Sequence, residues 1–97
     1  MYGTVARMKA KSGHEDALLE LQREELQLAE ADQIGFLYVY KLDGSENEYI
    51  MVVGFESKEA YKTNAESPEQ HERYLRYMEH MDGDPEWNDG EIILAHA

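Results

Sequence analysis

His71 is the side chain in this sequence best suited to proton transfer. It opens a series that recurs at helical spacing, namely His71, Tyr74, Leu75, Met78 and Met81. Positions three, four and seven residues apart share one face of a helix, so this spacing turns His71 toward the sheet. Histidine changes charge near neutral pH, and an inward histidine at the rim could deprotonate a phenolic substrate. The alternative is a rim histidine bonded only to solvent or backbone.

A second group of side chains could hold such a substrate. Arg7 could bind a substrate oxyanion, or it could pair with an acid of the last strand. Asn64 could hydrogen-bond a substrate carbonyl or simply end a short helix. Tyr74 lies one turn from the histidine. Tyr38 and Tyr40 could stack on an aromatic ligand, although aromatic rows in hairpins are more often core or dimer interface.

Other aromatic and titratable side chains are assigned structural places. His80 shares a side of the last helix with Arg73, Arg76 and Tyr77, away from the apolar stripe, so we expect His80 in solvent. Trp87 is expected to anchor the last loop, and stacking on a ligand is the less favoured alternative.

Composition excludes or disfavours several other chemistries. The chain has no cysteine, which removes disulfides, thiolate metal sites and cysteine nucleophiles. No histidine cluster has metal-ligand spacing, and no phosphate-binding glycine loop or nucleotide fingerprint is present. We therefore expect neither a metal nor an organic cofactor. The 21 acidic and 9 basic residues give a net charge of −12, which disfavours nucleic acid and acidic membrane surfaces as partners.

The 97 residues fit a single domain over 1–97. No apolar run approaches the ~20 residues that span a bilayer. The first six residues lack a basic segment followed by a long apolar stretch, so no secretory signal is predicted. With the absence of cysteine, this favours a cytoplasmic location.

The elements that position these side chains alternate between strand and helix. Strands are predicted at 2–10, 35–42, 48–55 and 91–95, and helices at 13–32, 57–65 and 67–81. Capping boxes mark two helix starts, Ser12 with Glu15 and Ser67 with Gln70. The resulting order, β-α-β-β-α-β, predicts an α+β, ferredoxin-like fold with a four-stranded antiparallel sheet and helices on one face.

The central hairpin is apolar on both faces. One face is assigned Phe36, Tyr38, Tyr40, Tyr49, Met51, Val53 and Phe55, and the other Leu37, Val39, Ile50, Val52 and Gly54. Helices can cover only one of these faces, and monomers avoid large exposed apolar patches. A second subunit laid sheet to sheet would cover the other. The sequence therefore predicts a homodimer with a shared eight-stranded barrel or sandwich.

This architecture resembles the dimeric α+β barrel superfamily, and the local sequence is similar to its antibiotic biosynthesis monooxygenase (ABM) branch. The similar stretches are Lys11–Ala17, Gly35–Phe36, Phe55–Tyr61, Ser67–His71 and Asp89–Glu91. Their order and spacing cover nearly the whole chain. The resemblance implies one ABM-like domain and an oxygenase acting on aromatic polyketides or quinol-like substrates, often without a metal or organic cofactor.

The family also contains haem-degrading members. Those relatives use an asparagine late in the first strand, a tryptophan near the end of the short helix and a histidine on the last helix. The corresponding positions here are Arg7, Asn64 and Tyr74, and all three depart from that pattern. These three departures disfavour haem binding, although the Tyr74 phenol is a conceivable iron donor.

Two functions remain open. The first is a small cofactor-independent monooxygenase that acts on an aromatic, polyketide or quinol-like substrate, with His71 as general base. The second is a non-catalytic dimeric barrel that binds a small ligand or serves a stress or regulatory role. A cavity between the last helix and the sheet, lined by His71, Tyr74, Asn64 and Arg7, would favour the first.

Overall fold

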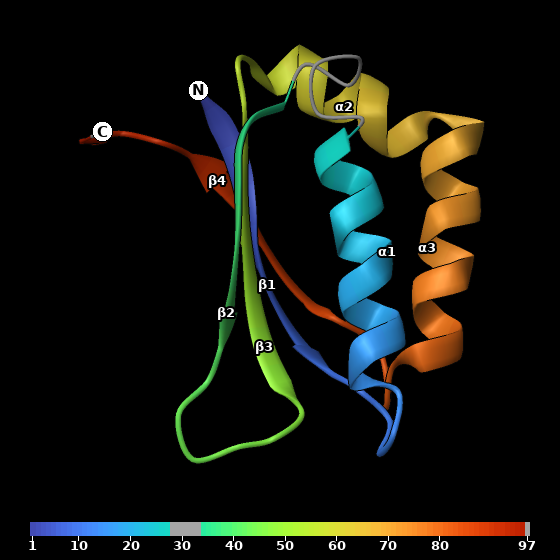
Figure 1. The fold of residues 1–97 in the computed structure, drawn as a ribbon. Helices are drawn as coiled ribbons and strands as arrows, with labels where there is room; N and C mark the ends of the chain where they lie inside the picture. The colour runs from blue at the N-terminus through green and yellow to red at the C-terminus, as the bar shows by residue number, and fades with distance from the viewer. Residues whose placement is uncertain (28–33, 97) are drawn as a thin grey trace.

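The computed structural model describes residues 1–27 and 34–96, which fold as a sheet covered by helices. The elements are β1 (Tyr2–Lys9), α1 (Glu15–Gln27), β2 (Ile34–Lys41), β3 (Glu48–Phe55), α2 (Lys58–Glu66), α3 (Pro68–His80) and β4 (Glu86–Glu91). The strands form one antiparallel sheet in the order β2-β3-β1-β4. Figure 1 shows the helices on one face of this sheet. The predicted α+β, ferredoxin-like fold is therefore confirmed.

Serine side chains begin two of the helices. The Ser57 hydroxyl accepts a hydrogen bond from the Ala60 N–H at 3.0 Å, which starts α2. The Ser67 hydroxyl accepts one from the Gln70 N–H at 3.1 Å, which starts α3. The Ser67 N–H also donates to the last turn of α2. One serine therefore ends one helix and begins the next.

Replacing Ser67 with alanine should lower the free energy of unfolding by about 1 kcal/mol, because the substitution removes the hydroxyl cap of α3. The backbone bond that ends α2 needs no side chain and should survive. Urea denaturation followed by circular dichroism would measure the loss. Ser12→Ala is the matched control, since α1 begins only at Glu15. Equal stability of the two variants would contradict the capping role.

The start of α1 differs from the prediction. Ser12 and Gly13 form a turn, in which Gly13 has a φ of 85°, and the helix begins at Glu15. The predicted capping box of Ser12 with Glu15 is wrong because this turn places the serine too far before the helix. The predicted end of the helix, near residue 32, lies outside the described residues.

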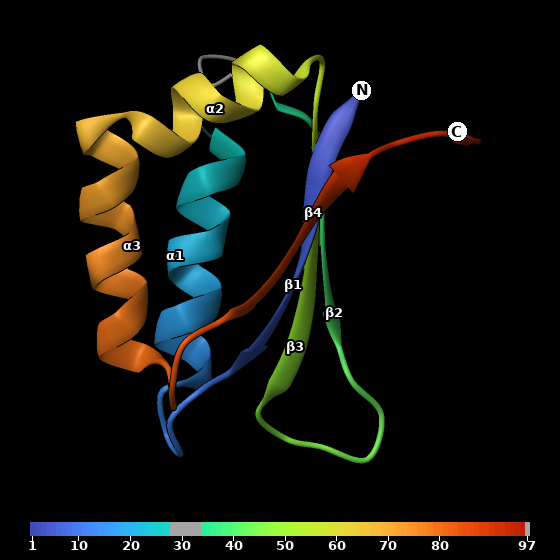
Figure 2. The same ribbon diagram turned by 180° about the vertical axis from the view of Figure 1, so that it is seen from behind.

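The last strand was predicted at 91–95, and the structure places it at Glu86–Glu91. It pairs with β1 from Arg7 opposite Glu86 to Tyr2 opposite Glu91. The apolar run that motivated the prediction lies beyond this pairing, where Ile93 is 90% exposed. Backbone pairing, rather than apolar composition, sets this strand. Figures 1 and 2 show the segment after it leaving the sheet on the side away from the helices.

The turn between β2 and β3 determines which residues of the hairpin share a face of the sheet. The Leu42 N–H donates to the Glu48 carbonyl, which leaves residues 43–47 as the loop. Leu37 then lies opposite Val53, and residues of equal parity in the two strands share a face. The predicted assignment is wrong for β2, because it grouped Phe36 with the odd-numbered residues of β3. Both faces nevertheless remain apolar.

The hydrophobic core lies between the helices and the face of the sheet that they cover. The buried apolar residues of this core are Ala6, Met8, Ala10, Leu18, Met51, Val53, Phe55, Tyr77 and Met81. The uncovered face carries three rows of paired residues, which are Tyr40, Ile50, Arg7 and Glu86; Tyr38, Val52, Val5 and Asn88; and Phe36, Gly54, Gly3 and Gly90. Its tyrosines Tyr38 and Tyr40 are 57% and 53% exposed. We name this surface the open face.

The buried side of α3 is rotated from the predicted stripe. Arg73 and Tyr77 are only 6% and 7% exposed, whereas Leu75 is 52% exposed. The end of the helix fixes this rotation, since Met81 bridges to Ala10 of the strand segment leading to α1. The prediction that Arg73 and Tyr77 lie on the side of the helix away from the core was therefore wrong. Long side chains with apolar stems can lie in a core that a hydropathy pattern does not assign to them.

His80 also departs from its predicted place in solvent. It is half-buried, and its Nδ1 lies 3.0 Å from Nδ1 of His14. One nitrogen of the pair must donate while the other accepts, so this contact joins the end of α3 to the start of α1.

Within the described ranges, no helix is long and apolar enough to cross a membrane.

Candidate functional site

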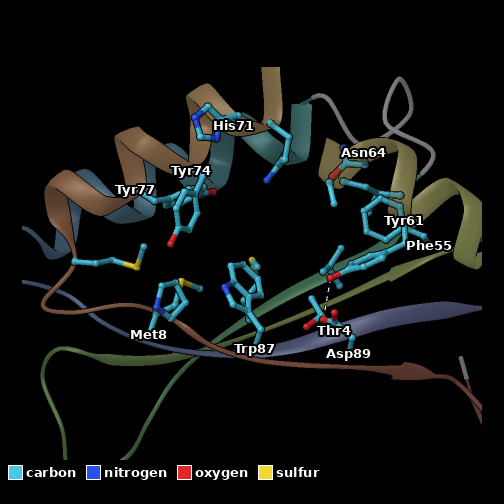
Figure 3. Close-up of a pocket in the computed structure, with 17 residues that line it drawn as sticks. Thr4, Met8, Phe55, Tyr61, Asn64, His71, Tyr74, Tyr77, Trp87 and Asp89 are labelled. Carbon is cyan, nitrogen blue, oxygen red and sulfur yellow. Dashed lines mark hydrogen bonds between the residues drawn. The ribbon is translucent and has the colours of Figure 1, made fainter. Parts of the chain in front are cut away.

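A cavity of about 400 Å³ lies between the sheet and helices α2 and α3 (Figure 3). Its lining residues are Thr4, Met8, Ile34, Met51, Val53, Phe55, Tyr61, Asn64, Ala65, Gln70, His71, Tyr74, Tyr77, Met81, Pro85, Trp87 and Asp89. Most of them are apolar or aromatic, with a few polar groups between them. This composition is typical of a small-molecule site.

The residues that α3 and β4 contribute to the cavity are spaced by the periodicity of a helix and of a strand. On α3, His71, Tyr74 and Tyr77 are spaced by three residues, so they follow one side of the helix. On β4, Trp87 and Asp89 are two residues apart and point to the same side of the sheet. Figure 3 shows Tyr74 and Tyr77 projecting from the helix toward the sheet strands that carry Trp87 and Met8.

The structure brings together three of the six predicted site residues. His71, Tyr74 and Asn64 all line the cavity, from α3 and α2. His71 is exposed and lies at the rim, in the first turn of its helix. Its position at the rim agrees with the expectation from the sequence.

The other three predicted residues lie on the open face. Arg7 points away from the cavity, and its guanidinium lies 3.3 Å from the carboxylate of Glu48 on β3. Tyr38 and Tyr40 share that side of the sheet, exposed to solvent. The structure therefore separates Arg7, Tyr38 and Tyr40 from His71 by the thickness of the sheet.

Tyr61 and Asp89 form the main polar contact of the cavity. The Tyr61 hydroxyl donates to Oδ1 of Asp89 at 2.8 Å. Burial raises the pKa of the Tyr61 phenol, and its hydrogen bond to Asp89 and the charge of that carboxylate raise it further. The phenol therefore stays protonated and keeps donating across the physiological range.

Above about pH 10 the free energy of unfolding should fall more steeply in the wild type than in Tyr61→Phe. Unfolding returns the Tyr61 phenol to its ordinary pKa, so the unfolded chain loses this proton first and is favoured as pH rises. Below that pH this contribution is fully present. Urea denaturation at several alkaline pH values would measure both slopes. Some fall should remain in the variant, because burial also raises the pKa of Tyr49. Parallel slopes would contradict the expectation.

The sequence missed Asp89, Tyr61 and Tyr77 as site residues and assigned Trp87 mainly to the last loop. The signal for the two β4 residues was available, because alternation along Glu86–Glu91 would have placed Trp87 and Asp89 on one face. The polar composition of that segment resembled a loop and concealed the strand. Among the described residues, no group of three or more histidines and acids is placed to hold a metal ion.

The arrangement can accommodate a flat, largely apolar molecule. Aromatic rings and methionines offer stacking and dispersion contacts, Asn64 and Gln70 offer amide hydrogen bonds, and the imidazole at the rim can accept a proton.

Comparison with known proteins gives one family and many similar structures. The sequence model of the family Antibiotic biosynthesis monooxygenase matches residues 1–76. Among curated proteins, none matches this chain. A candidate antibiotic biosynthesis monooxygenase from Deinococcus radiodurans shares 14% identity at a TM-score of 0.85, over 100% of this chain and 97% of the other.

A further similar structure is a candidate monooxygenase of the same description from Nitrosomonas europaea. It shares 10% identity at a TM-score of 0.82, over 97% of this chain and 100% of the other. Another, from Caulobacter crescentus, shares 14% identity at a TM-score of 0.84, over 96% and 90% of the two chains. At such identities the likeness shows a shared fold.

Proposed function

Because this chain belongs to the antibiotic biosynthesis monooxygenase family, we propose that it oxidises a small aromatic, polyketide- or quinol-like substrate with dioxygen and without a cofactor of its own. The observation that supports this most is the cavity of about 400 Å³, in which a rim histidine, an amide and several aromatic rings converge. A flat phenolic substrate would lie between the rings of α3 and the ring of Trp87.

The proposed reaction begins with proton transfer to His71. A phenol, or the enol form of an anthrone, gives its proton to the imidazole and becomes an electron-rich anion. The anion passes one electron to O₂, and the resulting radical and superoxide combine to form a carbon–oxygen bond. The peroxide takes a proton back from the imidazolium and then loses water.

The atoms and electrons of this reaction balance without an external reductant. For a substrate methylene, one oxygen atom of O₂ becomes the carbonyl oxygen. The other oxygen leaves as water with the two methylene hydrogens. The substrate is oxidised by four electrons, and O₂ is reduced by the same four. Asn64 is suited to hydrogen-bond the substrate carbonyl near the reacting carbon, and the rings hold the substrate plane.

Dioxygen uptake tests this function directly. The protein is mixed with a panel of hydroquinones and anthrones, with and without added flavin or haem, and the rate is compared with that of each substrate alone. We expect faster uptake with at least one substrate in the absence of flavin and haem, with one O₂ consumed per ketone formed. Uptake that requires added flavin or haem would contradict the cofactor-independent reaction.

We also propose that the protein is a homodimer whose subunits pack through their open faces. This surface places Val5, Val52, Ile50 and the tyrosines side by side, without a helix to cover them. The segment after β4, which contains the exposed residues Ile93 and Leu94, leaves the sheet on the same side. A two-fold pairing of open faces would bury these groups and leave both cavities on the outside.

Sedimentation equilibrium at micromolar concentration should give about twice the chain mass of 11.2 kDa. Val5→Asp should shift the mass toward that of a single chain, because it places a charge in the middle of the open face. Leu26→Asp on α1 is the matched control, since that leucine is similarly exposed but lies in the helical layer. A wild-type mass of one chain would contradict the dimer.

A further inference from the structure

The lining of the cavity contains a carboxylate and no lysine or arginine to offset its charge. Among its 17 lining residues, Asp89 is the only aspartate or glutamate, and there is no lysine or arginine. Ion pairs that join Arg7 to Glu48, Lys9 to Asp82, Arg23 to Glu20 and Arg76 to Glu24 lie outside this lining. A ligand that entered this cavity would therefore meet a carboxylate without a counter-charge in the lining.

The aromatic walls of the cavity also favour a positively charged ligand. Five aromatic residues line it, which are Phe55, Tyr61, Tyr74, Tyr77 and Trp87. The faces of aromatic rings carry partial negative charge and attract cations within about 6 Å of the ring centre. Figure 3 shows rings from helix and sheet on opposite sides of the open space.

Asp89 lies where the ring-lined space ends. Its Oδ1 accepts the Tyr61 hydroxyl at 2.8 Å, and the Phe55 and Tyr61 rings meet edge to face at 5.5 Å beside it. One phenol satisfies only part of the acceptor capacity of a carboxylate, so a ligand N–H could still bind. The Asp89 side chain is itself exposed, so this end of the cavity offers its carboxylate oxygens to a hydrogen-bond donor.

We propose that the ligand of this cavity is an organic cation, an aromatic molecule that carries a protonated amine. The ammonium group lies at the Asp89 end, where it donates to the carboxylate and contacts the faces of the surrounding rings. The aromatic body extends toward Tyr74 and His71. The inference rests on the proposed function in taking the same cavity, and it assigns the charge of the substrate. The net charge of −12 also raises the concentration of cations near the protein.

A series of ligands with one body and three charges tests the proposal. Tryptamine, tryptophol and indole-3-acetate share an indole and differ in bearing a cation, a neutral hydroxyl or an anion. Isothermal titration calorimetry at low and high salt would give each affinity. We expect tryptamine to bind about tenfold more tightly than tryptophol, the scale of a cation on aromatic rings, and indole-3-acetate to bind most weakly. Higher salt should reduce the preference only in part, because it screens the exposed Asp89 carboxylate but screens contacts with the buried Phe55 and Tyr77 rings much less.

The substitution Asp89→Asn tests the effect of the carboxylate charge separately from the effect of the shape of the cavity. The amide oxygen can still accept the Tyr61 hydroxyl, so the geometry is kept while the charge is removed. Tryptamine affinity should fall several-fold, and tryptophol affinity should change less than about twofold. Glu86→Gln removes the same charge from the same strand on the open face and should change neither affinity.

Each outcome decides the proposal. Equal affinities, tighter binding of tryptophol or indole-3-acetate, or no binding of tryptamine at millimolar concentration would overturn it. So would an equal loss in Asp89→Asn and Glu86→Gln. These failures would leave the oxygenase proposal intact if neutral aromatics still drive dioxygen uptake. Selective tryptamine binding without dioxygen uptake by any substrate would instead support the cation site and contradict the oxygenase.

Discussion

Replacing His71 with alanine should lower the rate of substrate oxidation by about 100-fold or more, the usual scale of a positioned proton acceptor. The imidazole lines the rim of the cavity from the first turn of α3. The alanine variant has no side chain at this position that could accept the proton of the substrate.

The stability of His71→Ala should remain close to that of the wild type, because the exposed side chain buries little apolar surface. Dioxygen uptake and urea denaturation on the same samples would separate lost chemistry from lost folding. His80→Ala is the matched control, since it removes a histidine from the same helix but outside the cavity. Its uptake rate per folded molecule should equal that of the wild type.

More than half of the wild-type turnover in His71→Ala would end the general-base role. Catalysis would then rest on Asn64 or on ionisation of the substrate itself. No turnover in any form of the protein, with binding retained, would favour the non-catalytic barrel that binds a small ligand.

Replacing Gly3 with alanine should destabilise the fold by about 3 kcal/mol or more. Gly3 lies in β1, which pairs with β3 on one side and β4 on the other. An added Cβ would clash with the Val53 carbonyl oxygen and lie 3.0 Å from the Gly54 Cα. Both atoms belong to the backbone of a central strand, so neither can move without disrupting the sheet.

Gly90→Ala is the matched control for this substitution. Gly90 pairs directly with Gly3, but a Cβ added there meets nothing within 4 Å. Urea denaturation should show a change below about 0.5 kcal/mol for Gly90→Ala. Similar losses in both variants would show that crowding against Val53 does not limit position 3.

The fold was predictable where its signals are local. The hairpin bounds follow from a polar turn between two apolar runs, and β3 was placed at its observed residues, 48–55. The starts of α2 and α3 follow from Ser57 and Ser67, whose hydroxyls cap the helices as their spacing indicates. Such features depend on a few neighbouring residues and are readable from the chain alone.

The predictions that failed concern features that are set by contacts between segments far apart in the sequence. The position of β4 depends on its pairing with β1, whose residues lie 79 to 89 positions away, and the polar run Glu86–Glu91 gives little local sign of this pairing. The rotation of α3 depends on the bridge between Met81 and Ala10, and the hairpin faces depend on the turn bond between Leu42 and Glu48. None of these contacts follows from apolar periodicity.

The candidate site shows the same division. His71, Tyr74 and Asn64 could be placed because a helical period or a helix end positions each of them. Arg7 was placed on a strand correctly, but the side of the sheet it faces was not determined. Asp89 could not be recognised while its strand was assigned to the residues after it.

The edge position of β4 has a consequence for how this family could diversify. The match to the family ends at residue 76, yet Met81, Pro85, Trp87 and Asp89 contribute to the cavity from the segment that follows. Within the sheet β4 pairs with β1 alone, so its sequence can change with little effect on the central hairpin. Ligand selectivity could therefore change through substitutions in this one short edge segment, while the rest of the domain stays the same. A chimera carrying residues 82–91 from a relative should acquire the ligand preference of the donor.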